Sequence, residues 1–261
     1  MRGRRGLCLL TALLAAAILA SFLIGRYPVA PWTVVRVILA GVLPITPDWP
    51  AVVHSVVMDV RLPRILGAAL VGSGLALSGA CYQGVFRNPL VSPFILGVSA
   101  GAGFGAALAI LWFPWPDAVA ASAFLFGLVA VALCFGLAHS YRAAPTLVLV
   151  LAGVIVGALF TALLSLLKYT ADPESKLPVI EFWLLGSLSS IGWRDVAMLF
   201  VLFVPGAAVL FALRWRVNLL AVGDDEARSL GVDTARLRGI VVVVATLLAA
   251  ATVAVGGIIG W

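Results

Sequence analysis

The chain has 261 residues, of which 63% are hydrophobic and 11% charged, and its formal net charge is +6 at pH 7. Soluble domains carry about 25% charged residues, so this composition excludes an ordinary soluble protein and predicts an all-α, polytopic bundle of transmembrane helices. Lysine occurs only at Lys168 and Lys176, neither of which follows a glycine, so the chain has no P-loop for ATP. Any work driven by ATP therefore requires a partner subunit.

Seven apolar runs predict seven membrane spans, since a spanning helix needs about 20 apolar residues. The runs cover residues 7–24, 65–86, 94–113, 119–138, 146–167, 196–213 and 239–260. The first run follows a cluster of arginines and also resembles a signal peptide, but its length and poor cleavage site favour an uncleaved span. Residues 26–60, which are rich in proline and aromatic residues, are expected to form an extramembrane loop with short interfacial helices.

The distribution of basic residues predicts the orientation in the membrane. With seven spans, the side that holds the N-terminus carries the larger share of Lys and Arg, namely Arg2, Arg4, Arg5, Arg87, Arg142, Arg214, Arg216, Arg228, Arg236 and Arg238. Cytoplasmic loops are enriched in Lys and Arg, so we expect the N-terminus inside the cell. Residues 26–60 then lie outside, and the charged loop 214–238 lies in the cytoplasm.

The chain offers few groups for ion coupling or catalysis. No Asp, Glu, Lys or Arg falls in the apolar centre of a run, which argues against a secondary transporter or channel, because such proteins usually bury charged groups along their path. The two histidines, His54 and His139, are far apart and belong to no metal-binding or catalytic motif, which argues against a membrane enzyme. We therefore expect no catalytic residue, no cofactor and no bound metal.

A polar segment with two prolines separates the second and third runs. Asn88 and Pro89 should end one helix, because proline lacks an N–H and disfavours helix in the residue before it, and Pro93 permits a new start. Irregular backbone inside a membrane must be covered by protein or border water. Residues that could line a pathway or pack helices closely, including glycines spaced four apart, are Gln83, Asn88, Pro89, Pro93, Gly97 and Gly101.

Residues 218–238 form the most charged stretch and predict a helical hairpin. Asp224 is expected to cap a helix that begins at Asp225, whose first-turn acids suit the positive end of the helix dipole. Gly231 is expected to end this helix in a left-handed conformation, and a second, basic helix should start at Thr234. An ordinary solvated loop is the alternative.

Several specific motifs follow one another from about residue 56 onward: Arg61-Leu62-Pro63-Arg64, Gly79 with Gln83, Asn88-Pro89-Leu90 with Pro93 and Leu96-Gly97, Trp183-Leu184-Leu185-Gly186-Ser187-Leu188, Gly223-Asp224-Asp225-Glu226-Ala227 with Leu230-Gly231-Val232, and Gly256-Gly257-Ile258-Ile259-Gly260. With these motifs the chain resembles the permease subunits of ABC importers for iron-siderophores, haem and cobalamin. Because several specific motifs occur in the same order as in that family, the probability of a chance agreement is very small.

The resemblance implies a single permease domain of ten helices, working as a homo- or heterodimer in the bacterial cytoplasmic membrane, with hydrolysis of ATP on separate cytoplasmic subunits. It implies that these ATPase subunits dock on Gly223, Asp224, Asp225, Glu226, Ala227, Leu230 and Gly231. It also implies that Arg61 and Arg64 face carboxylates of an external substrate-binding protein, a pairing that suits arginine. The implied cargo is an iron chelate; haem, cobalamin and oxyanions stay open as alternatives.

Members of this family continue beyond the Gly-Ile-Ile-Gly segment with further helices, whereas the sequence here stops at Trp261. The resemblance therefore leads us to expect a fragment or a truncated product that lacks roughly the last three helices. The family role is accordingly expected of the intact protein.

Overall fold

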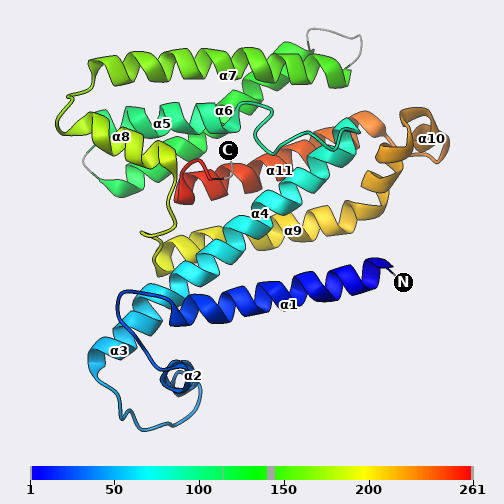
Figure 1. The fold of residues 1–261 in the computed structure, drawn as a ribbon. Coiled ribbons are helices and arrows are strands. Elements are labelled where there is room, and N and C mark those ends of the chain that lie inside the picture. Colours follow the sequence, from blue (N-terminus) through cyan, green and yellow to red (C-terminus); the bar gives the residue numbers. More distant parts are fainter. Residues whose placement is uncertain (1, 114, 140–144, 260–261) are drawn as a thin grey trace. The chain divides into compact units, whose positions relative to one another are not determined.

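The computed structural model describes residues 2–113, 115–139 and 145–259, and in these residues the fold is all-α, as the composition predicted. The elements are α1 (Arg2–Leu23), α2 (Pro31–Ala40), α3 (Ala51–Ser55), a π-helical turn η1 (Val56–Arg61), α4 (Leu62–Phe86), α5 (Val98–Trp112), α6 (Pro116–His139), α7 (Pro145–Thr170), α8 (Lys176–Leu185), α9 (Trp193–Val222), α10 (Asp224–Ser229) and α11 (Thr234–Gly256) (Figure 1). Arg142, Gly260 and Trp261, which the sequence analysis named, lie outside the described residues.

Six helices in the described part of the chain are long and apolar enough to cross a membrane, one fewer than predicted. The run 94–113 accounts for the difference, because its helix α5 has only 15 residues and is therefore about 22 Å long at 1.5 Å per residue. The hydrocarbon core of a bilayer is about 30 Å thick. The run is shortened at its start, where residues 94–97 belong to the irregular connection instead of the helix.

Two other elements are longer than their apolar runs. α9 continues to Val222, so helix replaces the first part of the predicted loop 214–238. The stretch from Ala51 to Phe86 is helical throughout, so the end of the predicted loop 26–60 joins α4 without a break. The π-helical turn η1 lies just before Pro63, whose missing N–H interrupts the regular bonding pattern.

The chain divides into two compact units. The smaller unit comprises Met1–Ala69 with Ser189–Ala197, and the larger unit comprises Leu70–Leu188 with Met198–Trp261. In the smaller unit, buried side chains from α1, α2, α3 and η1 pack together with Val29, which precedes α2: they are Phe22, Val29, Val34, Val37, Val53 and Val57. This cluster joins the end of α1 to the start of the long helix that follows.

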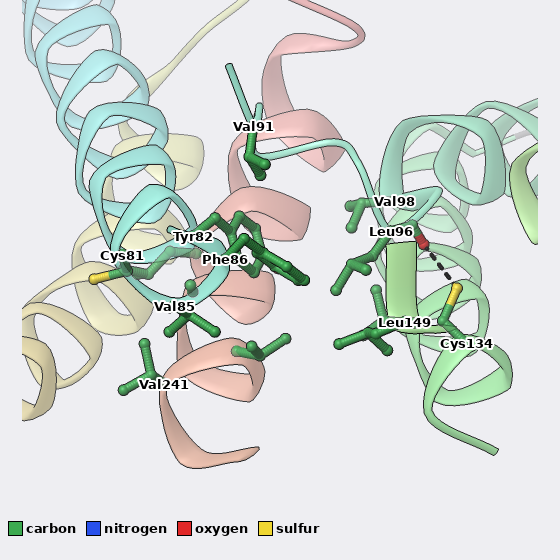
Figure 2. Close-up of a cluster of buried hydrophobic side chains, with 14 of the residues drawn as sticks. Cys81, Tyr82, Val85, Phe86, Val91, Leu96, Val98, Cys134, Leu149 and Val241 are labelled. Carbon is green, nitrogen blue, oxygen red and sulfur yellow. Dashed lines mark hydrogen bonds between the residues drawn. The ribbon is translucent and has the colours of Figure 1, made fainter. Parts of the chain in front are cut away.

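The core of the larger unit brings together α4, the segment 87–97, α6, α7 and α11. Figure 2 shows Tyr82 and Phe86 of α4 near Val91, Leu96 and Val241, all of them buried. The Tyr82 hydroxyl lies 2.6 Å from the Thr246 hydroxyl, which adds a polar link between α4 and α11. Val91 and Leu96 belong to the core, so the second part of the irregular segment is packed inside this unit, whereas residues 87–90 are exposed.

Close backbone approach joins α5 to its neighbours. A Cβ atom added at Gly101 would overlap the Phe126 carbonyl of α6, and one added at Gly153 of α7 would overlap the Ile95 carbonyl. The Ser122 hydroxyl of α6 donates to the Gly105 carbonyl at 2.7 Å. Small residues therefore let these helices pack at short distance, as is common in membranes.

Candidate functional site

Segment 218–238 folds into a helical hairpin made of the end of α9, α10 and the start of α11. Gly231 has a φ of 79°, a left-handed conformation that glycine adopts without strain, and its N–H donates to the Arg228 carbonyl at 2.9 Å. Asp233 caps α11, because its carboxylate accepts a hydrogen bond from the Arg236 N–H at 3.0 Å. The turn and the two flanking helices agree with the pattern read from the sequence.

The cap predicted for Asp224 is wrong. α10 begins at Asp224 itself, and Gly223 stands at the N-cap position without any side-chain cap bond. A terminal nitrogen of Arg238 lies 3.0 Å from each oxygen of the Asp224 carboxylate, and Arg87 also donates to that carboxylate. Two guanidinium groups from α11 and from the end of α4 therefore hold the side chain that local sequence rules assign to the cap.

Opposing effects act on the pKa of Asp224. Burial raises this pKa, but the hydrogen bond and charge of Arg238, with the charges of Arg87 and Arg228, lower it by more. The net result is a pKa below the usual value of an aspartic acid, so the carboxylate is fully ionised at neutral pH. The electrostatics of the cluster thus favour the paired, charged state.

The other residues of α10 divide between a buried and an exposed face. Ala227 is completely buried, whereas the side chain of Asp225 is 96% exposed and lies 3.8 Å from Arg228. Glu226 and Leu230 are also exposed. The hairpin therefore presents two carboxylates and one large apolar side chain to its surroundings. On its other face, the ion pairs of Asp224 and the buried Ala227 hold it against the rest of the unit.

Arg61 and Arg64 differ in environment, although both belong to the predicted docking motif. Arg61 is buried, and its two terminal nitrogens donate to the Phe22 and Tyr27 carbonyls, each at 2.5 Å. Arg61 therefore ties the end of α1 and the following turn to η1. Arg64 is exposed on α4.

The irregular segment after α4 contains most of the residues predicted for a pathway. Asn88 makes a local turn, in which its side-chain oxygen accepts a hydrogen bond from the Leu90 N–H at 2.9 Å. Gln83, Asn88 and Pro89 are exposed, whereas Gly97 is buried. Gly97 has a φ of 77° and stands immediately before α5, against the backbone of Gly157.

A cavity of about 590 Å³ opens where this segment meets α5 and α7. Its lining includes Ser92, Gly97 and Ser99 from the segment and α5, and Gly157 and Thr161 from α7, together with apolar side chains. None of its lining residues carries an ionisable side chain. Such a lining offers hydroxyl groups, backbone and apolar surface, which suits passage or weak binding more than chemistry.

The sequence analysis did not select Arg87 and Arg238 as site residues. Arg87 lies directly before the Asn-Pro pair and has a φ of 50°, a strained conformation for a residue other than glycine. The sequence offered one indication of their role, because Arg87 adjoins the Asn-Pro motif and Arg238 ends the charged stretch 218–238. Their common partner, Asp224, is 137 residues from Arg87 and 14 residues from Arg238. Only the tertiary fold brings these side chains together.

The described residues contain no group of three or more His, Cys, Asp or Glu side chains that could hold a metal ion. The arrangement thus consists of a packed helical bundle, an uncharged cavity and an ion-paired helical hairpin.

A sequence profile described as the FecCD transport family matches residues 13–261. The chain belongs to the FecCD transport family. A relative, the molybdate import system permease protein MolB of Haemophilus influenzae, is 42% identical over 252 residues, which are 97% of this chain and 74% of the relative. The cobalamin import system permease protein BtuC of Halobacterium salinarum is 37% identical over 235 residues, or 88% of this chain and 62% of that protein.

The fold is also similar to a solved structure of a metal-chelate type ABC transporter in an inward-facing conformation. The TM-score is 0.84 at 41% sequence identity, and the match covers 99% of this chain and 78% of that one. The FecCD chain described here thus spans about three quarters of the molybdate relative and less than two thirds of the cobalamin relative. With its long apolar helices, it is a multi-pass membrane protein.

Proposed function

We propose that the chain is the permease subunit of an ATP-driven importer and is not itself an enzyme. The observation that carries the proposal is the hairpin at α10, which exposes Asp225, Glu226 and Leu230 and is anchored through Asp224 to α11 and to the residue that follows α4. A short, rigidly held helix with an exposed face is suited to receive a force-generating partner. The partner is an ATPase pair on the cytoplasmic side, since the chain has no P-loop.

The remaining parts of the site are assigned by position and charge. The cavity beside Gly97 and Gly157 forms part of the path of the cargo between two permease copies, which are identical or related. Arg64 receives a carboxylate of an external substrate-binding protein, while buried Arg61 supports the local fold. The hydrogen bond between Arg87 and Asp224 puts the end of α4 and the hairpin on the same side, so the shorter helix α5 must cross together with α6, α7 and α9. With α5 counted, the N-terminus and the hairpin lie together in the cytoplasm of a bacterial cell, and the permease spans the cytoplasmic membrane.

Alternating access gives the mechanism. Binding of ATP closes the two ATPase subunits, α10 follows them, and the packed helices change from one arrangement to another, so that the cavity changes the side to which it opens. A secondary transporter is disfavoured because the cavity lining carries no ionisable group to couple an ion gradient.

An iron chelate is the first candidate cargo, because the chain resembles iron-siderophore permeases and its fold is similar to that of a metal-chelate transporter. Molybdate is the second candidate, and the 42% identity to a molybdate permease favours it. Haem and cobalamin are further alternatives.

Uptake into proteoliposomes distinguishes these cargoes. The chain is reconstituted with its cognate ATPase and binding protein, and entry of radioactive ferric siderophore or molybdate is measured with ATP and with ADP. We expect accumulation of one cargo that requires both ATP and the binding protein. ATP-independent uptake driven by an ion gradient would contradict the proposal, and uptake of molybdate alone would replace the first candidate with the second.

A further inference from the structure

Asp224 joins α10 to two elements that are distant in sequence. A terminal nitrogen of Arg238 in α11 lies 3.0 Å from both of its oxygens, and Arg87 at the end of α4 donates to the same carboxylate. Arg87 also donates through Nε to the Leu220 carbonyl near the end of α9, at 2.8 Å. One cluster thus connects α4, α9, α10 and α11.

This cluster is shielded from water more than the other ion pairs on α10. The side chains of Arg238, Asp224 and Arg87 are 11%, 29% and 39% exposed, whereas those of the Asp225–Arg228 pair are 96% and 63% exposed. The Nε atom of Arg238 is buried and makes no hydrogen bond, so this guanidinium depends on the bonds that its terminal nitrogen donates to Asp224. Separating α10 from α11 would leave a buried charge unpaired, which is costly.

Arg87 continues directly into the segment that borders the cavity. Its φ of 50° is held in place by the bonds to Asp224 and Leu220. Ten residues later, Gly97 lines the cavity and lies against Gly157 of α7. Residues 87–90 are exposed, but Val91 and Leu96 are buried in the core, so a displacement of Arg87 can reach the cavity through this packed second part of the segment.

We infer that Arg87 and Arg238 are positioning residues that make α10 move as one body with α11 and with the segment 87–97 at the cavity. The inference rests on the proposed function, because it concerns how a movement of the ATPase partner reaches the path of the cargo. When α10 is displaced, Arg238 pulls α11 and Arg87 pulls the connection to α5. The cluster sets how much transport results from each ATP, without contacting cargo or nucleotide.

The test measures cargo transported per ATP hydrolysed in proteoliposomes that contain the chain, its cognate ATPase and its binding protein. Asp224→Asn, Arg87→Gln and Arg238→Gln should each lower this ratio about five-fold or more, while ATP hydrolysis continues. Asp224→Glu, which keeps the charge, should recover part of the ratio. The matched control is Glu181→Gln, which removes an ion pair with Lys168 between α7 and α8, 2.6 Å in length, and should leave the ratio unchanged.

A double variant shows whether Arg87 and Asp224 act through the same contact or whether each substitution disturbs the fold independently. Arg87 acts partly through Asp224 and partly through the Leu220 carbonyl, so the loss in the double variant Asp224→Asn with Arg87→Gln should be smaller than the two single losses combined. The inference is overturned if the three variants match the Glu181→Gln control, or if they lower hydrolysis and transport in proportion. It is also overturned if the three variants, and Asp224→Glu as well, fail to insert in the membrane. If the unmodified chain shows no ATP-driven transport, the proposed function fails instead.

Discussion

At the scale of single residues, Asp224 shows how tertiary contacts decide the state of a carboxylate. Burial alone raises its pKa, but Arg238, Arg87 and Arg228 lower it below the usual aspartic acid value. Ionised Asp224 therefore stabilises the fold at pH values above its unfolded pKa of about 3.9, and this contribution is lost as the pH falls through the lowered folded value.

A pH series on Asp224→Asn tests this account. At pH 7 the variant should unfold at a lower temperature than the parent, by a loss of about 1–3 kcal/mol, because it removes a charged acceptor from two guanidinium groups. The difference should shrink as the pH falls below about 4, where the carboxylate of the unfolded chain becomes protonated, and it should disappear once the pH has passed the lowered pKa of the folded protein. Thermal unfolding in detergent, followed by intrinsic tryptophan fluorescence, measures it. A difference that grows on acidification would contradict the assigned direction of the pKa.

The residue scale is also where sequence patterns are weakest. The left-handed Gly231 and the helix start at Thr234 follow from local rules for ending and starting helices, and the structure agrees with both. Asp224 does not follow its local rule, because Arg87 and Arg238 approach it from distant parts of the chain. The burial of Arg61 likewise depends on carbonyl groups at the end of α1 that no spacing in the sequence reveals.

At the scale of elements, α7 and the segment 94–97 are in contact at a glycine. Gly153 lies so close to the Ile95 carbonyl that no Cβ atom fits between them. The apolar pattern of α7 predicts a span, but it does not indicate which glycine touches a neighbour. The short length of α5 was missed for a related reason, because residues 94–97 are apolar enough to read as helix.

Substituting two glycines tests this contact. Gly153→Ala should destabilise the protein by about 1–3 kcal/mol, since the added methyl group must push α7 away from the segment beside the cavity. Gly72→Ala is the matched control: it lies inside α4 with nothing within 4 Å of an added Cβ, so the helix propensity of alanine should leave stability equal or slightly higher. The two thermal midpoints are compared in the same detergent. Equal midpoints would show that the contact is loose.

At the scale of the whole molecule, hydropathy alone predicts most of the architecture. The long apolar helices and the charged hairpin are evident in the sequence, because a bilayer demands continuous apolar helix and because charges collect outside it. The division into two compact units could not be predicted, since it depends on which helices pack together.

The exposed arginine of the docking motif gives a prediction for the assembly. Arg64→Glu should weaken binding of the substrate-binding protein about ten-fold or more and slow its association, because it places a negative charge opposite carboxylates. Arg64 lies exposed at the start of α4. Arg36→Gln, which removes an external ion pair with Asp48, is the control and should bind normally. Surface plasmon resonance on the permease in nanodiscs measures both. Unchanged binding by Arg64→Glu would place the docking site elsewhere.

The central claim is that this chain converts the cycle of an ATPase partner into import. The most direct measurement is ATP hydrolysis by the chain and its cognate ATPase, purified together in nanodiscs, with and without the binding protein. The account predicts that the two subunits co-purify and that the binding protein stimulates hydrolysis only when the chain is present. An ATPase that never associates with the chain, or whose hydrolysis is indifferent to it, would contradict the account.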